Sequence, residues 1–298
     1  MRILYVVPVL FCCFFLMGVA GSQAKISADS TSYEHRLEEG IDAFYKSKWV
    51  KAQRIFDALK QQQPTDSRAY FFDSMIPFWK YYFGEKSSEA AEEFMQRSQK
   101  AIEVSTQQLN ENSSDTTMVL MLSGLYGYQS LVLATEENYR AALQGGMTGF
   151  KYTRQLLSIN DDNPKALIGK GIFYYMIGSV PNGLKWVTNM VGISADMQEG
   201  LEVLEQAANS DSYISNDAKM ILAYLYEREE KYDRSLTHLE ELCERYPENI
   251  IFQYNRARLL EKNNQPTLAR KKYQQIVKMN TQVLEILQQK SKARLHNL

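Results

Sequence analysis

Cysteine is scarce in this chain. Cys12 and Cys13 fall within the first two dozen residues, and Cys243 is the only cysteine that follows them. If the N-terminal segment is removed, the single remaining thiol cannot form an internal disulfide. The stability of the folded part must then come from packing.

Glycine and proline are also few, with 15 and 7 in 298 residues. A strand-rich fold needs many tight turns, and these two residues are the usual ones to make them. The composition therefore favours helices joined by short turns.

The motifs of the common catalytic and metal sites are missing. The three histidines, His35, His238 and His296, are too dispersed for a usual zinc site, and no G-x-S-x-G occurs. The glycine run GGMTG at 145–149 lacks the Gly-Lys-Ser/Thr that closes a phosphate loop. The chain is therefore expected to be no enzyme and to hold no metal and no cofactor. An enzyme whose residues converge from different parts of the chain is the alternative left open.

His238 and Cys243 are the closest approach to a reactive pair. Five residues on a helix turn the side chains about 140° apart, so the two cannot form a dyad. Cys243 follows Leu242 in an apolar stripe and is expected to be buried, whereas His238 is expected at the helix surface.

Neither sign of charge dominates. Lys and Arg number 34 against 35 Asp and Glu, for a formal net charge of −1. Neutralising phosphates requires a basic face, so this balance argues against nucleic acid as the main partner.

The first 24 residues have the form of a signal peptide. Arg2 gives a positive start, the run from Ile3 to Val19 is uncharged and mostly apolar, and Ser22-Gln23-Ala24 offers a small–x–small cleavage site. We expect an exported protein, periplasmic or envelope-associated, with a short linker at 25–32. The alternative is an uncleaved anchor, because the apolar run approaches the length of a membrane span.

An internal repeat occupies much of the rest. Residue types recur at an interval of 34 between the stretch that starts at Ala218 and the one that starts at Phe252. The pairs are Ala223/Ala257, Tyr226/Leu260, Ser235/Ala269, Leu239/Tyr273 and Leu242/Ile276. EEGIDAFYKSKWVKAQRIFDALKQQQPTD, near the N-terminus, fits the same frame. The period and residue types resemble the tetratricopeptide repeat (TPR) family.

The spacing has a physical reason. Each unit is a pair of antiparallel helices, A and B, whose backbones approach closely where both carry a small residue. One such pair cannot bury its own apolar stripe, so the units must stack. We expect an all-α fold: an α-solenoid over 33–298 with about six pairs and a polar capping helix from about Thr281. The small positions are Gly40, Ala223 and Ala257 in A, and Ala52, Ser235 and Ala269 in B.

The middle of the chain carries a second resemblance. NPKALIGKGIFYYMIGSVPNGLKW and DMQEGLEVLEQAA are similar to bacterial TPR proteins related to the inclusion-body-clearance family. The matching residues are Pro181, Leu184, Lys185, Asp196 and Gly200. The resemblance implies a helical solenoid that binds other proteins, and it implies no catalytic residues. An insert at 179–196 separates an A helix from its B helix, and we expect it to plug the groove or to dock a second subunit.

The strongest candidate for a functional site is one wall of a concave groove. In TPR stacks the A helices line that groove, and the matching positions here recur on one helical face. Tyrosine and arginine, the side chains that most often anchor interfaces, are well represented among them. The predicted wall consists of Met220, Tyr224, Glu227, Arg228, Tyr254, Arg258, Glu261 and Lys262.

An aromatic-rich stretch, YFFDSMIPFWKYYFG at 70–84, allows two interpretations. It fills space between long helices, with Pro77 kinking or ending a helix, or it exposes an aromatic patch. We expect a non-catalytic scaffold that holds a protein or peptide in its groove, with envelope complex assembly and peripheral membrane association left open. The alternative is a small-ligand or lipid carrier with an apolar pocket near 70–84 and 179–196.

Overall fold

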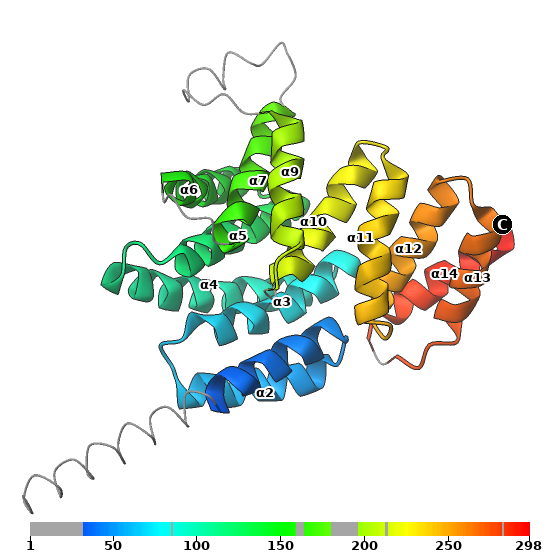
Figure 1. Ribbon diagram of the computed structural model, residues 1–298. Coiled ribbons are helices and arrows are strands. Elements are labelled where there is room, and N and C mark those ends of the chain that lie inside the picture. The colour runs from blue at the N-terminus through cyan, green and yellow to red at the C-terminus, as the bar shows by residue number, and fades with distance from the viewer. Residues whose placement is uncertain (1–31, 85, 159–163, 180–195, 212–213, 282) are drawn as a thin grey trace, which may run out of the picture.

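The structure is a computed structural model that describes residues 32–84, 86–158, 164–179, 196–211, 214–281 and 283–298. In these ranges all regular secondary structure is helical, which confirms the predicted fold class (Figure 1). The predicted signal peptide, linker and most of the insert, including Pro181, Leu184 and Lys185, lie outside the described residues.

Within the described ranges, the helices form six antiparallel pairs followed by one further helix. They are 32–45 with α2 (Trp49–Gln62), α3 (Ser67–Phe83) with α4 (Ser88–Glu111), α5 (Thr116–Thr135) with α6 (Tyr139–Ser158), α7 (Pro164–Gly178) with α9 (Met197–Ala208), α10 (Ile214–Arg228) with α11 (Tyr232–Arg245), and α12 (Ile250–Lys262) with α13 (Pro266–Val277). The capping helix α14 spans Glu285–Asn297.

Short side chains at the N-termini start several helices. The carboxylates of Asp66, Asp115 and Asp196 and the amide oxygen of Asn249 accept hydrogen bonds from backbone N–H groups of the first turns of α3, α5, α9 and α12. Such caps satisfy N–H groups that have no partner inside the helix. Asp196, one of the residues of the second resemblance, therefore sets the start of a B helix.

The turns inside five pairs share one backbone feature. Each of them has a residue with positive φ, between 54° and 60°, two positions before its B helix: Ser47, Lys86, Glu137, Glu230 and Asn264. Glycine adopts this conformation without strain, yet the chain uses other residues at all five places.

The small positions of the repeat lie where the helices approach. Ala52, Ala257 and Ala269 have no exposed surface, and a Cβ on Gly40 would meet the ring of Phe56 at 2.7 Å. Gly200 fits between backbones, because a Cβ there would lie 2.4 Å from the amide nitrogen of Tyr175. Like Asp196, Gly200 is a residue of the second resemblance that lies in the described part of the chain. It stands where α7 and α9 are in contact.

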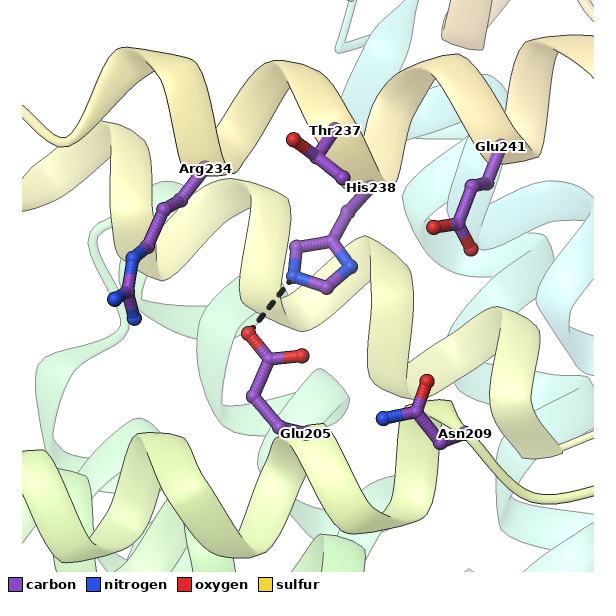
Figure 2. A pocket seen from close by; sticks show the side chains of 6 residues that line it. All are labelled: Glu205, Asn209, Arg234, Thr237, His238 and Glu241. Carbon is purple, nitrogen blue, oxygen red and sulfur yellow. Dashed lines mark hydrogen bonds and ion pairs between the residues drawn. The ribbon is translucent and has the colours of Figure 1, made fainter.

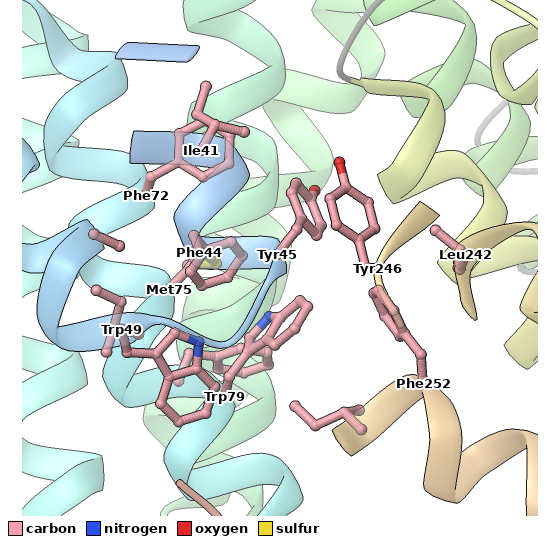
Figure 3. Packing of buried hydrophobic residues seen from close by; sticks show 14 of the residues in the cluster. Ile41, Phe44, Tyr45, Trp49, Phe72, Met75, Trp79, Leu242, Tyr246 and Phe252 are labelled. Carbon is pink, nitrogen blue, oxygen red and sulfur yellow. The ribbon is translucent and has the colours of Figure 1, made fainter. Parts of the chain in front are cut away.

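The first two helix pairs and the last two, here called the two halves of the stack, pack against each other (Figure 3). The ring of Tyr45 stacks on that of Tyr246 with centroids 5.3 Å apart, and Trp79 meets Phe252 edge-on at 6.0 Å. The Asn249 side chain donates to the Tyr45 carbonyl at 2.7 Å. The first two pairs and the last two therefore share one core, which the repeat pattern does not predict.

The aromatic stretch supplies much of that core. Phe72, Phe78, Trp79 and Tyr81 are buried, and α3 continues through Pro77 without a break. The space-filling interpretation is therefore right for these side chains. Tyr82 is the exception, with 38% of its surface exposed.

Candidate functional site on the inner face of the A helices

Helix α10 shows which side of an A helix faces inward. Tyr226 and the Ala223 carbonyl contact α11 through His238 and Ser235, so this side faces the B helices. The opposite side carries Asp217, Met220, Tyr224 and Arg228, at helical spacing. This is the inner face, and it contains three residues of the predicted wall.

The first half of this face is covered. The Asp217 carboxylate accepts a hydrogen bond from the Tyr45 hydroxyl, and Met220 packs against the core that the two halves share. On α12, Phe252 is covered by Trp79. The N-terminal turns of both A helices are therefore closed to a partner by the chain itself.

The second half of the face is open. Tyr224 has 59% of its surface exposed and lies near Tyr82 on α3, whose pKa is raised by burial and by the neighbouring Tyr224. On α5, Gln129 and Ser130 contact α4 and α6, and Leu131, on the side away from them, is 41% exposed.

Tyr82, Leu131 and Tyr224 all lie in the C-terminal parts of A helices. Consecutive A helices of a stack run in the same direction, so these side chains all lie toward the same end of the stack. We call Tyr82, Leu131, Tyr224 and Arg228 the inner opening.

A charged cluster borders the inner opening. Glu227 accepts a two-point hydrogen bond from Arg258, with one nitrogen–oxygen distance of 2.7 Å, and a further bond from Lys262 at 2.7 Å. Burial raises the pKa of the Glu227 carboxyl, but the hydrogen bonds from Arg258 and Lys262 outweigh this effect and hold the pKa below its ordinary value. The cluster fixes the last turns of α10 and α12 relative to each other.

The other predicted wall residues are also engaged. Glu261 accepts from the Tyr273 hydroxyl at 3.0 Å and from Arg294 at 3.3 Å, and Tyr254 packs against Tyr273 with ring centroids 6.0 Å apart. The Arg228 guanidinium lies over the Tyr175 ring at 5.9 Å. The structure thus joins Glu227, Arg258 and Lys262 directly and leaves Tyr224 and Arg228 exposed.

The predicted wall does not include Tyr82 or Leu131, although the sequence left open an exposed aromatic patch at 70–84. Both belong to units in which the 34-residue frame is loose, so the wall positions could not be carried onto them. The sequence feature that could have identified these two residues is their position near the C-terminal ends of apolar A helices.

The expectation for His238 was wrong, and that for Cys243 is confirmed. His238 is only 7% exposed because Tyr226 and Glu205 cover it, and Cys243 is 2% exposed. Burial raises the pKa of the Cys243 thiol to about 11. Within the described residues, no group of three or more His, Cys, Asp or Glu side chains is placed to hold a metal ion.

Helix α5 is long and apolar enough to cross a membrane by length and composition. Val119, Leu122 and Leu125 on this helix have no exposed surface, and their neighbours belong to the shared core. Part of its apolar surface is therefore buried in the fold, and 39% of the apolar window lies in the interior.

The comparisons with known proteins agree with this architecture. Residues 165–290 match the family model described as Iml2/Tetratricopeptide repeat protein 39. A search among curated proteins gave no match.

Three solved structures are similar at low sequence identity. A thermophilic TPR protein of Thermus thermophilus has 14% identity and a TM-score of 0.46, over 77% of this chain and 99% of that one. A TPR protein of Parabacteroides merdae has 17% identity and a TM-score of 0.37, over 89% and 88%. The human IFIT1 dimer with m7Gppp-AAAA has 15% identity and a TM-score of 0.44, over 92% and 59%. At such values these likenesses assign no function. The paired-helix stack is the architecture of a tetratricopeptide repeat solenoid, and residues 165–290 of the chain are related to the Iml2/Tetratricopeptide repeat protein 39 family.

Proposed function

We propose that this protein is an exported, non-catalytic scaffold that binds a segment of a partner protein at the inner opening. The observation that carries the proposal is the exposure of Tyr224 and Tyr82 on a face whose first half is closed by the chain itself. Large half-polar rings left open on a rigid surface are typical anchors of protein interfaces.

The side chains around the inner opening are already held in place, so few of them would have to become ordered when a partner binds. Arg258 and Lys262 hold Glu227 in place, and Arg228 rests on the Tyr175 ring. A partner that meets fixed side chains loses less conformational entropy on binding. The exposed guanidinium of Arg228 adds a donor for a carboxylate or carbonyl of the bound segment.

The carrier alternative loses its support at Trp79. The rings of Phe44, Tyr45, Phe83 and Phe252 surround the indole at centroid distances of 4.6 to 6.0 Å. Side chains therefore fill the space in which the ligand would lie. Trp186, the other residue of that hypothesis, lies outside the described residues.

Export is supported by the N-terminal sequence, in which Arg2 precedes an apolar run and a small–x–small site. As part of the proposal, the exported protein lies in the periplasm or on an envelope membrane. There it takes part in the assembly of an envelope complex. The intact mass of the protein from an envelope fraction tests cleavage after Ala24. A chain that keeps its first 24 residues in the cytosol would contradict export.

Photocrosslinking tests the inner opening. A photoreactive amino acid at position 224 is expected to give a crosslinked partner, which mass spectrometry identifies. The same amino acid at Tyr139, which is 67% exposed on the B helix α6, is the matched control.

Substitution then checks the contact. Tyr224→Ala together with Arg228→Gln is expected to abolish co-purification of the crosslinked partner, and Tyr139→Ala is expected to leave it unchanged. Equal crosslinking at 139 and 224, or full retention of the partner by the double variant, would overturn the assignment of this surface.

A further inference from the structure

A cavity of about 200 Å³ lies between α9 and α11, on the side of the stack formed by B helices (Figure 2). It is separate from the inner opening, which belongs to the A helices. Its lining residues are Glu205, Asn209, Arg234, Thr237, His238 and Glu241. Neither the TPR architecture nor the proposed function assigns it a role.

The chain around this cavity is acidic. Helix α9, which forms one side of the cavity, carries Glu199, Glu202 and Glu205 and neither Lys nor Arg. Two carboxylates, of Glu205 and Glu241, line the cavity itself. Its surroundings therefore favour a positively charged group.

The Arg234 guanidinium, the one lining cation, is already engaged. It donates to the Tyr226 hydroxyl at 3.2 Å and lies over the same ring at 5.5 Å. Figure 2 shows it at one end of the cavity, while Asn209 and Glu241 lie at the other end. An anion would have to compete with Tyr226 for this guanidinium.

Glu205 and Tyr226 hold His238 in a fixed orientation. The Tyr226 hydroxyl donates to the Glu205 carboxylate at 2.8 Å, and His238 Nε2 lies 3.1 Å from the same oxygen. The imidazole stacks on the Tyr226 ring with an interplanar angle of 1°. Because a carboxylate only accepts, the proton of the neutral ring is on Nε2.

His238 Nδ1 is then a bare acceptor. This atom is buried and has no hydrogen-bond partner, and leaving a buried acceptor unpaired costs free energy. In Figure 2 the ring nitrogen that carries no dashed line is directed toward the side of Glu241 and Asn209. The unpaired acceptor therefore lies beneath the end of the cavity at which the Glu241 carboxylate stands.

Glu241 leaves one oxygen for a ligand. Its Oε2 accepts from Lys219 Nζ at 2.7 Å, and its side chain is 48% exposed. Together with His238 Nδ1 and the amide oxygen of Asn209, this end of the cavity offers acceptors. A ligand that fits must bring several donors and a positive charge.

We propose that the cavity between α9 and α11 binds a guanidinium or primary ammonium group. A guanidinium carries five N–H donors and no acceptor, which matches this lining. The group comes from a free small amine or from a basic side chain of a partner protein. A metal ion does not fit, because the described lining contains no set of three ligating side chains placed for one.

Calorimetric titration of the full chain at about pH 8, where an imidazole is neutral, tests the proposal. One arm uses agmatine, which carries both an ammonium and a guanidinium group. The second uses the blocked tripeptide acetyl-Gly-Arg-Gly-amide, and its citrulline analogue is the neutral control. Binding of agmatine alone identifies a small-molecule site, and binding of the arginine peptide identifies a side-chain site. Either supports the proposal if the citrulline peptide does not bind.

Two glutamates give a matched pair of variants. Glu241→Gln removes the lining carboxylate and is expected to weaken binding about tenfold or more, since hydrogen bonds to charged groups are the strong ones. Glu240→Gln makes the same change at the exposed neighbour, which does not line the cavity, and is expected to leave binding unchanged. Both glutamates lie at the helix surface, so both variants are expected to fold.

The imidazole of His238 gives a direct readout. Its Nδ1 resonance in the ¹⁵N spectrum is expected to move on saturation with agmatine, while those of His35 and His296 stay in place. Equal losses in the two variants, equal binding of the citrulline peptide, or no binding of agmatine and the arginine peptide would each overturn the proposal.

Discussion

The Tyr45 hydroxyl donates a hydrogen bond to the carboxylate of Asp217, 172 positions further along the chain. The bond links the first helix pair to the fifth, beside the stacked rings of Tyr45 and Tyr246. Because the two halves meet there, the stack is closed over part of its inner face. The part of the inner face that stays uncovered is therefore confined to the C-terminal ends of the A helices.

Asp217 makes this contact sensitive to pH. Burial raises the pKa of its carboxyl from 3.8 to about 6, although the hydrogen bond from Tyr45 acts in the opposite direction. The folded chain thus keeps this proton to a higher pH than the unfolded chain does. The stability that it contributes is complete below about pH 4 and is lost as the pH rises through about 6, a change of about 2 to 3 kcal/mol.

Asp217→Asn is expected to abolish this dependence while keeping an oxygen that accepts from Tyr45. In urea unfolding, the variant should gain about 2 to 3 kcal/mol relative to the wild type between about pH 4 and pH 7. Glu241→Gln, which changes an exposed carboxylate, is the control. A difference between Asp217→Asn and the wild type that does not change with pH would contradict the raised pKa.

Asn249 contributes to both the start of α12 and the contact between the halves. Its Oδ1 accepts from the N–H groups of Ile251 and Phe252 at 2.9 and 3.2 Å, and its Nδ2 donates to the Tyr45 carbonyl at 2.7 Å. Asn249→Ala is expected to cost about 2 kcal/mol, about half from the cap and half from the buried bond. Asn249→Ser keeps a cap acceptor and should cost about 1 kcal/mol.

Urea unfolding of the three proteins at neutral pH measures these values. The intermediate position of the serine variant is the informative result. If serine and alanine cost the same, the cap contributes nothing beyond the bond to Tyr45.

The local architecture was predictable because it repeats. Ala223 and Ala257, 34 residues apart, are buried at equivalent places, and the same interval identified the inner face of α10. The contact between the halves has no such period. Tyr45 and Asp217 are polar residues whose environment depends on the curvature of the whole stack. The sequence therefore predicts that Met220 and Tyr224 lie on one face of the helix. It does not predict that Met220 is covered and Tyr224 is exposed.

His238 shows the same limit on a smaller scale. It stands one position before Leu239, the residue that fills the gap to the next layer, so the pattern of α11 alone places it at the surface. Its burial comes from Glu205 on α9, in the preceding pair, and from Tyr226 on α10, the A helix of its own pair. The contacts that a side chain makes with neighbouring helices depend on the register of those helices, and the sequence of a single repeat does not reveal that register.

Glu230 occupies a strained turn and is expected to be improved by glycine. Its φ is 56°, in the region where a side chain costs about 1 kcal/mol, and the residue is exposed. Glu230→Gly should raise the free energy of unfolding by about 0.5 kcal/mol, because the gain exceeds the added freedom of the unfolded chain. Glu230→Ala keeps the strain and should bring no gain in the same urea titration. Equal stability of the two variants would argue against a strained turn.

Gly200 and Gly127 should respond in opposite directions to alanine. A Cβ at Gly200 would lie 2.4 Å from the Tyr175 nitrogen and 2.7 Å from the Gly171 carbonyl oxygen, so α7 and α9 would have to separate. At Gly127, on α5, a Cβ would meet no atom within 4 Å. Backbone cannot yield as a flexible side chain does, so Gly200→Ala is expected to cost about 3 kcal/mol or more. Gly127→Ala is expected to stabilise by about 0.5 to 1 kcal/mol, the ordinary helix preference for alanine over glycine. Thermal unfolding of both variants measures the contrast, and a stable Gly200→Ala protein would mean that α7 and α9 do not cross this closely.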